Sequence, residues 1–267
     1  MDSMKEFRPE VPARVTGLAK PERPTINQVS ASDIQAFQDC PRKFYYQSVL
    51  RLGKLADRDP EVATNRGSLI HLLLEWGSTQ QAEMLFARMQ VPPNQAEDML
   101  AVVERFQQSA FMQRLLASPK LQKEQAFYLK LSDDGQTPRY LKGFIDAVAW
   151  QADGSLLIVD FKTGASDKTQ LDYQTQADCY ALVGLSQGAE CVQVLMVRPE
   201  VLVNDGEPEV FAFGYELAQQ EDLRQNLLAV IGAMEQAESA SVEAVAPDYC
   251  NRSCHIPVGL CEKSTLA

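Results

Sequence analysis

The pattern of apolar and polar positions predicts strands and helices that alternate along most of the chain. Short runs rich in β-branched and aromatic residues predict strands, and longer segments with apolar residues three or four positions apart predict helices. The predicted strands are Gln122–Leu131, Tyr140–Trp150, Ser155–Lys162 and Cys191–Arg198, with Phe211–Tyr215 as a candidate edge strand. The first predicted helix begins at a cap formed by Ser32 or Asp33 and runs to about Leu52. The other predicted helices are Ser68–Arg88, Asn94–Leu116, Leu171–Ser186 and Gln219–Ala237.

The order of these elements predicts an α/β fold. The helix Leu171–Ser186 separates two strands and so predicts a β-α-β crossover, whereas the turn Ala152–Ser155 predicts an antiparallel hairpin. We therefore expect a central mixed sheet with helices on both sides, and a helical insertion at about residues 68–117. Residues 1–28 contain four prolines without periodicity and predict a flexible arm, which leaves residues 29–267 as a single domain.

Composition narrows the class of protein. The 267 residues are 45% hydrophobic and 23% charged, as in soluble globular proteins. The sequence shows no apolar run of about 20 residues and no signal-peptide pattern, so we expect a cytoplasmic protein without membrane contact. In that compartment the six cysteines are expected to be thiols or metal ligands rather than disulfides.

The net charge of −11 is unfavourable for a general nucleic-acid binder, but the charges are unevenly distributed. Residues Asp205–Asp248 include ten acidic side chains and one basic side chain, Arg224. Residues Cys40–Ala56 include four basic side chains and no acidic one. A local basic face can therefore coexist with an acidic body. Candidate phosphate contacts are Arg42, Lys43, Arg51 and Lys142, although each also reads as an ordinary solvated side chain.

Two carboxylates and a lysine on the predicted hairpin are the strongest candidates for chemistry. Asp160 and Lys162 are two residues apart on a strand and so point to the same face, while Phe161 points into the core. Asp146 lies on the neighbouring strand. Mg²⁺ usually takes one or two carboxylates and completes its shell with water and substrate phosphate. A surface salt bridge is the alternative, but the apolar residues around Asp160 predict buried charges, which need partners or a metal.

These residues resemble the core motif of the PD-(D/E)XK nucleases, in particular the RecB-like and AddB-like exonucleases. The motif reads Gly143-x-x-Asp146, a hairpin, and then Val159-Asp160-x-Lys162-Thr-Gly. Further segments match that branch in the expected order, and the match extends from about Ser30 to Cys261. They are Ser30–Ile34 followed by Phe37, Cys40-Pro41, Lys43-Phe44 and Tyr46; Arg66–His71, with a Gly-x-x-x-His motif; Glu124; and Gln176–Tyr180, with a Gln-x-x-x-Tyr motif.

The resemblance implies a restriction-endonuclease-like core and metal-dependent hydrolysis of DNA phosphodiester bonds. It favours single-stranded DNA ends as the substrate, in DNA repair, recombination or CRISPR adaptation, with a helicase or a repair complex as a candidate partner. The implied ligands of Mg²⁺ or Mn²⁺ are Asp146, Asp160, the carbonyl of Phe161 and His71, the last of which either binds or flanks the ion. The implied role of Lys162 is to position the attacking water.

The remaining implied site residues also have ordinary readings. Gln176 and Tyr180 would contact DNA or orient Lys162, but without the resemblance they are common helix residues. Glu124 would support the metal site or bind the metal. His71 alone would read as a histidine on a helix surface. A catalytically silent DNA- or protein-binding module with this fold is the alternative function, and the complete set of candidate catalytic residues favours an enzyme.

Four cysteines predict a metal staple between the two ends of the domain. Cys250, Cys254 and Cys261, together with Cys40, are enough for a [4Fe-4S] cluster. In the iron–sulfur members of this branch, one cysteine precedes the core and three follow it, as here. The spacing Cys-x3-Cys-x6-Cys departs from the usual Cys-x2-Cys-x5-Cys. A structural Zn²⁺ site, with His255 as a candidate replacement ligand, and unligated thiols are the alternatives. The other two cysteines, Cys179 and Cys191, read as buried core residues.

Overall fold

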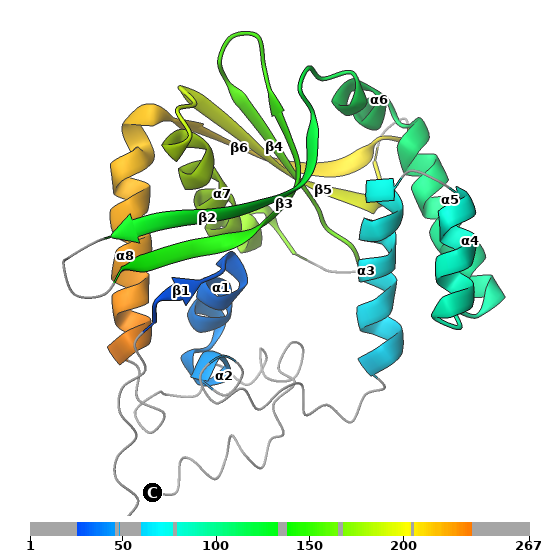
Figure 1. Ribbon diagram of the computed structural model, residues 1–267, viewed down its shortest axis with the longest axis horizontal. Coiled ribbons are helices and arrows are strands. Elements are labelled where there is room, and N and C mark those ends of the chain that lie inside the picture. The colour runs from blue at the N-terminus through cyan, green and yellow to red at the C-terminus, as the bar shows by residue number, and fades with distance from the viewer. Residues whose placement is uncertain are drawn as a thin grey trace, which may run out of the picture.

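A computed structural model describes residues 26–45, 48, 60–76, 79–132, 138–164, 168–203 and 206–236. Its centre is a mixed six-stranded sheet with helices on both sides, which confirms the predicted α/β fold (Figure 1). The strands are β1 (Gln28–Val29), β2 (Gln122–Ser132), β3 (Arg139–Trp150), β4 (Leu156–Phe161), β5 (Cys191–Leu202) and β6 (Pro208–Glu216). Strand β1 is not predicted, because two residues are too short to produce a pattern.

The pairing of the strands follows the predicted connections. Strands β3 and β4 form the antiparallel hairpin, and β4 and β5 are parallel across α7 (Gln174–Ser186), which is the predicted crossover. Strand β6 extends the sheet antiparallel to β5. Strand β3 is long enough to pair also with β2, antiparallel over most of its length, and with β1 in parallel. The β2–β3 hairpin therefore reaches beyond β4 and β5, toward α8 (Gln220–Gln236) (Figure 1).

The first predicted helix is wrong in its length. It is divided into α1 (Ala31–Asp39) and α2 (Pro41–Phe44), because Cys40 between them is extended, with φ −164° and ψ 105°. A proline disfavours the helical conformation of the residue before it, and Pro41 follows Cys40. The N-cap is Ser30, whose hydroxyl accepts a hydrogen bond from the backbone N–H of Asp33 in a capping box.

The helical insertion contains more breaks than the periodicity predicts. Two helices, α3 (Pro60–Trp76) and α4 (Thr79–Arg88), replace the predicted helix Ser68–Arg88. Two more, α5 (Pro93–Gln108) and α6 (Ala110–Leu116), replace Asn94–Leu116, with an extended residue, Ser109, between them. The apolar periodicity continues across these breaks because the helices pack into one shared cluster of buried residues. Two short 3₁₀ turns, η2 (Gln170–Tyr173) and η4 (Leu217–Gln219), precede α7 and α8.

Strand β4 is buried on both faces. Ile158 packs into the cluster formed with α1, α7 and α8, and Val159 packs into the cluster formed with α3, α5 and α6. Phe161 belongs to the second cluster, where its ring meets Phe106 edge to face with centroids 5.5 Å apart, so its predicted core position is confirmed. Polar side chains at the end of β4 are consequently held inside the protein.

The two cysteines predicted in the core differ in their environment. Cys179 on α7 is fully buried, and burial raises the pKa of its thiol. Cys191 is exposed, so its predicted burial is wrong: at the start of β5, alternate residues face solvent, and Cys191 occupies one of those positions. Among the helices of the described residues, none is long and apolar enough to cross a bilayer.

The last residues of the predicted arm contact the sheet. The carbonyl of Asn27 accepts a hydrogen bond from the Tyr140 N–H at 2.9 Å, and the N–H of Ile26 donates to Glu235 on α8 at 3.3 Å. The division into an arm and a domain stays a prediction, because residues 1–25 lie outside the described part of the chain, as does the cysteine-rich segment at residues 250–261.

Candidate active site

The fold brings the six candidate catalytic residues together at the C-terminal end of β4. Asp146 is on β3, His71 on α3, and Gln176 and Tyr180 on α7, while Asp160 and Lys162 come from the end of β4 itself. Four segments therefore supply one cluster of polar side chains, which lies where the two hydrophobic clusters meet.

Asp160 is the centre of this cluster and is 5% exposed. Its Oδ2 lies 2.5 Å from Lys162 Nζ. Its Oδ1 accepts hydrogen bonds from the Tyr180 hydroxyl at 2.7 Å and from Gln176 Nε2 at 3.0 Å. Burial raises the pKa of the Asp160 carboxyl, as does the negative charge of Asp146, while the Lys162 ammonium opposes the rise. The carboxylate is thus fixed in place at an electrostatic cost.

Lys162 is held between a carboxylate and an amide. Besides the contact with Asp160, its Nζ donates to Gln176 Oε1 at 2.5 Å, and its backbone N–H donates to the Val197 carbonyl on β5 at 2.7 Å. The ammonium also lies 5.8 Å from the centre of the Tyr173 ring. Gln176 therefore bridges the two charged residues, because its amide nitrogen binds Asp160 and its amide oxygen binds Lys162.

Asp146 joins the end of the hairpin to α3. Its Oδ2 accepts a hydrogen bond from the backbone N–H of Phe161 at 2.6 Å and lies 3.4 Å from His71 Nδ1. Burial alone would lower the pKa of His71, but the hydrogen bond to Asp146 and the charges of Asp146 and Asp160 outweigh it, so the pKa is raised. The Phe161 carbonyl as a metal ligand stays a prediction.

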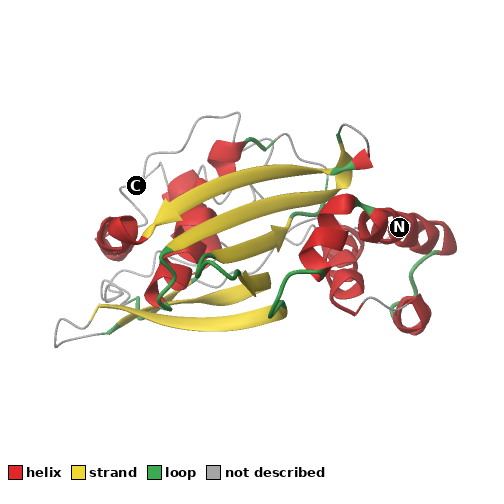
Figure 2. Cartoon of the chain, turned by 90° about the horizontal axis from the view of Figure 1, so that it is seen from above, coloured by secondary structure: helices red, strands yellow, loops and turns green. Residues whose placement is uncertain are grey.

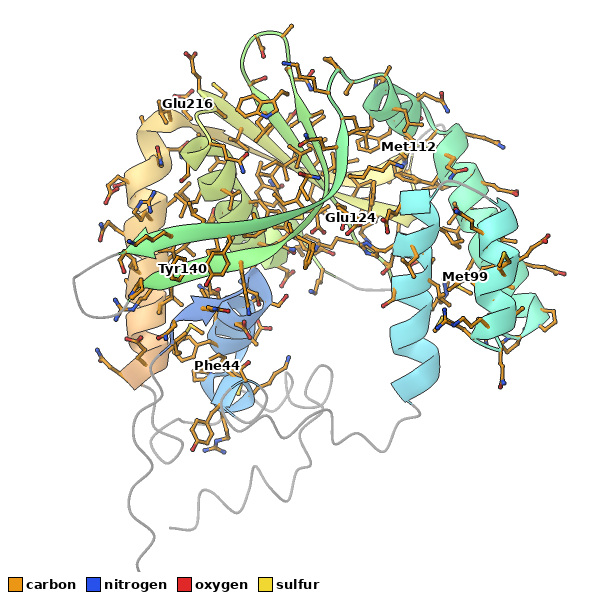
Figure 3. All side chains as sticks on the ribbon, viewed as in Figure 1. Phe44, Met99, Met112, Glu124, Tyr140 and Glu216 are labelled. Carbon is orange, nitrogen blue, oxygen red and sulfur yellow. The ribbon has the colours of Figure 1, made fainter. Side chains whose placement is uncertain are left out.

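Glu124 lies beside Asp146 in an unusual backbone conformation. Its neighbours Lys123 and Gln125 pair with Ala147 and Ile145, which places Glu124 opposite Asp146. Its φ of +49° lies in the left-handed region that residues other than glycine rarely adopt, and such strain concentrates at functional sites. Burial raises the pKa of Glu124, and the charges of Asp146 and Glu75 raise it further. In Figure 3, Glu124 is labelled close to the junction of β2, β3 and α3.

Glu75 is an acidic residue near the site that sequence reasoning missed. It lies on α3, four residues after His71, and its charge acts on Glu124. Positions four apart on a helix are neighbours on one face. The spacing from His71 could therefore have identified Glu75 as a candidate once His71 was placed at the site.

Residues 66 and 67 fix α3 against the segment that follows Lys162. Arg66 Nη2 lies 2.8 Å from Glu200 Oε1, and the other Glu200 oxygen accepts a hydrogen bond from the Gly164 N–H. A β-carbon added to Gly67 would lie 2.7 Å from Thr163 Oγ1. The glycine of the Gly-x-x-x-His motif thus permits a close approach of helix and strand end, which sets the position of His71.

The resemblance implies a DNA nuclease, and for that activity we expect Gly67→Val to lower the rate about 100-fold, since a displacement near 1 Å can cost that much in an organised site. The branched side chain would push α3, and His71 with it, away from Asp146. The double variant Gly67→Ala/Thr163→Ala removes the hydroxyl that a β-carbon would meet, so it should keep most of the activity. Single-turnover rates on the same DNA check both, and an active Gly67→Val protein would contradict the packing argument.

The residues at the site fit a hard divalent cation with a partly open shell. Within the described residues, no three histidine, cysteine or carboxylate side chains are arranged as a ready-made metal-binding group. Two carboxylates nevertheless suffice for Mg²⁺, which keeps positions for water and substrate. Asp160 Oδ2 is buried and, apart from its ion pair with Lys162, has no hydrogen-bond partner among the described residues, and the charge of Asp146 raises the pKa of Asp160. A cation between the two carboxylates would relieve that repulsion.

The four candidate phosphate contacts have different surroundings. Arg42 is 3% exposed, so the exposed basic face expected on the first helix does not include its side chain. Lys43 lines a pocket, and Lys142 on β3 is exposed with its Nζ 2.9 Å from Gln28 Oε1. Arg51 lies outside the described residues. The sequence could not show the burial of Arg42, because the break at Cys40 rotates α2 relative to α1.

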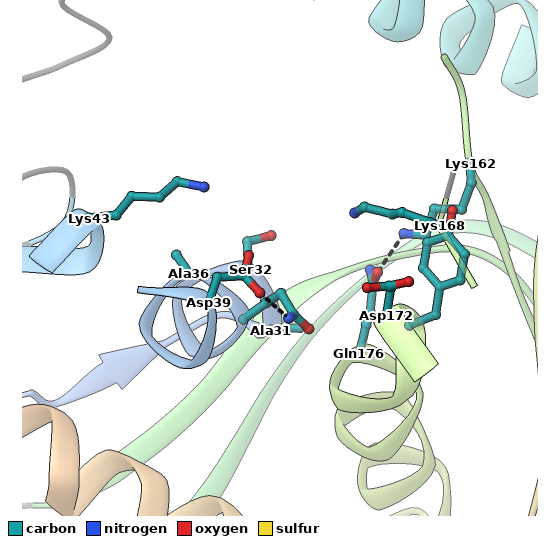
Figure 4. A pocket seen from close by; sticks show the side chains of 11 residues that line it. Ala31, Ser32, Ala36, Asp39, Lys43, Lys162, Lys168, Asp172 and Gln176 are labelled. Carbon is teal, nitrogen blue, oxygen red and sulfur yellow. Dashed lines mark hydrogen bonds between the residues drawn. The ribbon is translucent and has the colours of Figure 1, made fainter. Parts of the chain in front are cut away.

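A pocket of about 310 Å³ opens onto Lys162 (Figure 4). It lies between α1 and α2 on one side and η2 and α7 on the other, and Lys43 points into it from α2. Its lining is Ala31, Ser32, Gln35, Ala36, Asp39, Lys43, Lys162, Lys168, Asp172, Tyr173 and Gln176. Lys162 and Gln176 are therefore accessible from this side, and a substrate could reach them.

Comparison with known proteins agrees with this geometry. The sequence profile of the PD-(D/E)XK nuclease superfamily matches residues 28–258. The chain belongs to the PD-(D/E)XK nuclease superfamily. Membership suggests nuclease activity.

Comparisons with curated proteins and with solved structures add no further information about function. No curated protein matches this PD-(D/E)XK chain. One similar solved structure, titled "Crystal structure of SSO0001", aligns over 82% of this chain and 79% of that chain, with 14% sequence identity and a TM-score of 0.39.

Proposed function

We propose that the protein is a metal-dependent deoxyribonuclease that hydrolyses phosphodiester bonds at single-stranded DNA ends. The observation that carries the proposal is the convergence of Asp146, Asp160 and Lys162 at the end of β4, with Lys162 Nζ 2.5 Å from Asp160. Superfamily membership supports hydrolysis of nucleic acid, and the resemblance to RecB-like and AddB-like exonucleases supports DNA ends as the substrate.

Each residue has a role that its contacts support. Asp146 and Asp160 would hold Mg²⁺ or Mn²⁺, with His71 at the side of Asp146. When bound, the metal supplies charge that lowers the pKa of a water and stabilises the transition state of phosphoryl transfer. Lys162 orients the attacking water through its ammonium, which Gln176 and Asp160 hold in place. Gln176 and Tyr180 position the pair and need not touch the substrate.

A comparison of substrates tests the exonuclease proposal. We expect degradation of linear single-stranded DNA in Mg²⁺ or Mn²⁺ and none of circular single-stranded DNA of the same sequence, because only the linear form has ends. Labels on the 5′ or the 3′ end then give the polarity from the product ladder. Equal rates on the circular strand would replace the exonuclease proposal with an endonuclease, and faster cleavage of duplex or RNA would overturn the proposed substrate.

We further propose that Cys40, Cys250, Cys254 and Cys261 hold a [4Fe-4S] cluster, with structural Zn²⁺ as the alternative. Cys40 is buried where α1 meets α2, and the other three cysteines lie outside the described residues. The order of one cysteine before the nuclease core and three after it supports the cluster. Such a cluster would tie the chain ends together and play no part in hydrolysis.

Anaerobic purification followed by chemical analysis checks the metal. We expect iron and sulfide in equal amounts, and Cys254→Ser should lose both and unfold at lower temperature. Cys191→Ser is the matched control, because Cys191 is exposed and stands outside the set. Zinc without sulfide would favour the alternative, and a Cys254→Ser protein with full metal content would exclude this ligand set.

The setting of this activity is also a proposal. A helicase or a DNA-repair complex would supply single-stranded ends, as the resemblance favours, and we propose the cytoplasm as the location.

A further inference from the structure

One face of the β2–β3 hairpin carries exposed aromatic rings between lysines. Along β3, Leu141 and Ile145 are buried against the helices, and the residues between them point to the other face. That outward face carries Tyr140, Lys142 and Phe144 on β3, and Ala126, Tyr128 and Lys130 opposite them on β2. Phe144 is 64% exposed and Tyr128 is 55% exposed. We call Tyr128, Tyr140, Lys142 and Phe144 the aromatic track.

The rings of the aromatic track are already arranged for stacking. Tyr128 and Tyr140 are stacked, with centroids 4.5 Å apart and ring planes 22° apart. Lys142 pairs with Tyr128 across the strands and lies between the two aromatic residues of β3. In Figure 3, Tyr140 is labelled on the hairpin at a distance from Glu124. The strand register places the other residues of the track on β3 between Tyr140 and Asp146 and on β2 opposite them. Large apolar rings left exposed on a sheet face are typical of a binding surface.

The helices of the described part of the chain leave this face open. Helices α3 to α6 gather at one end of the sheet (Figure 2). The cluster they form includes residues of β4 and β5 but, from β3, only Ala147. The other helices, α1, α2, α7 and α8, pack in the cluster on the opposite face of the hairpin. An apolar face without a described partner therefore remains beside the active site.

The aromatic track is continuous with the active site. Phe144 is two residues from Asp146 on β3, which is about 7 Å along a strand. The carbonyl of Phe144 lies 3.0 Å from the Tyr180 hydroxyl, which also contacts Asp160. A chain that lies along the track from Tyr140 to Phe144 would thus arrive at the two carboxylates.

We propose that the aromatic track binds single-stranded DNA and leads it to Asp146 and Asp160. Bases of a single strand expose their flat faces and stack on aromatic rings, while lysines bind the phosphates. Bases in a duplex are already stacked on one another, so the track selects single strands. The inference deepens the proposed function, because it assigns the recognition of a single strand to residues outside the catalytic cluster.

Binding without cleavage tests the track. A fluorescent 20-nucleotide oligothymidine is titrated with protein in EDTA and followed by anisotropy. We expect Phe144→Ala and Tyr128→Ala each to weaken binding about 5- to 100-fold, the range for the loss of one stacked base. Phe144→Tyr keeps a ring and should bind like the wild type. Leu217→Ala is the matched control, because Leu217 is 48% exposed on η4, outside the track.

Salt dependence separates the lysine from the rings. Lys142→Ala should reduce the slope of log K against log salt by about 0.7, the contribution of one phosphate contact to a single strand. Phe144→Ala should weaken binding and leave that slope unchanged, because stacking releases no counterions.

The outcomes distinguish the track from the nuclease proposal. Unchanged affinity of both ring variants would overturn the track and leave this face to a protein partner or another segment of the chain. An equal loss of duplex binding would overturn it as well, and so would a wild-type protein without measurable single-strand binding. A wild-type protein that binds through the track and cuts nothing would instead contradict the proposed function. Phe144 and Tyr128 are largely exposed, so thermal unfolding of their variants should match the wild type.

Discussion

Replacing Lys162 with alanine is expected to lower the rate of DNA hydrolysis about 1,000-fold or more. The substitution removes one ammonium with two proposed effects: it stabilises charge in the transition state, and it orients the attacking water. Each effect alone contributes about 100-fold or more to the rate. The geometry gives the reason: Lys162 Nζ is held at the site by Asp160 at 2.5 Å and by Gln176 at 2.5 Å.

Lys168→Ala is the matched control for this prediction. Lys168 lies 5.4 Å from the same Tyr173 ring that Lys162 approaches, and both lysines line the pocket of Figure 4. If only the positive charge near the pocket mattered, the two variants should lose the same amount of activity. If the Lys162 ammonium has the proposed catalytic role, only Lys162→Ala should lose activity. Single-turnover rates with excess protein measure the comparison, and circular dichroism verifies that both variants are folded. Similar rates in the two variants would contradict the role of Lys162.

Asp146→Asn is expected to abolish both cleavage and the stabilisation of the fold by Mg²⁺. A ligand that binds only the folded protein at 100 times its dissociation constant adds about 2.7 kcal/mol to the free energy of unfolding. For a domain of this size, that corresponds to a rise of about 5–10 °C in the unfolding temperature. The variant should show no such rise, because asparagine supplies no charge to hold the ion beside Asp160.

Without metal, we expect Asp146→Asn to leave the stability of the fold unchanged or to increase it, which a merely damaging substitution would not do. The negative charge of Asp146 raises the pKa of the Asp160 carboxyl, so the two carboxylates destabilise one another without a metal. An asparagine oxygen can still accept the hydrogen bond that Phe161 N–H donates to Asp146 at 2.6 Å. In EDTA the variant should therefore unfold at a temperature equal to or above that of the wild type. A lower temperature in EDTA, or a normal response to Mg²⁺, would contradict a metal site at these carboxylates.

The arrangement of the central candidate residues could be predicted from the sequence because their positions follow from local rules. Period-two alternation put Asp160 and Lys162 on one face, and the turn Ala152–Ser155 put Asp146 on the adjacent strand. The convergence of His71, Gln176 and Tyr180 on these residues depended on the family resemblance, since nothing in a single helix reveals which strand it meets. The cysteine staple stays a prediction.

Other features depend on tertiary structure and left no readable pattern. The breaks at Cys40 and Ser109 interrupt helices whose apolar periodicity continues, and only Pro41 hints at the first. The left-handed conformation of Glu124 is imposed by its surroundings, because glutamate has no preference for it. The alternation that places Phe144 on an outward face is visible in the sequence, but the exposure of that face depends on where the helices gather.

The most direct test of the account is degradation of end-labelled single-stranded DNA by anaerobically purified wild-type protein in Mg²⁺, in Mn²⁺ and in EDTA. We expect a ladder of shortened products with either metal and intact DNA in EDTA, because Asp146 and Asp160 need the cation to act on a phosphate. Intact DNA in every metal, from protein shown to be folded with its metal content unchanged, would contradict the assignment of this site as a nuclease centre.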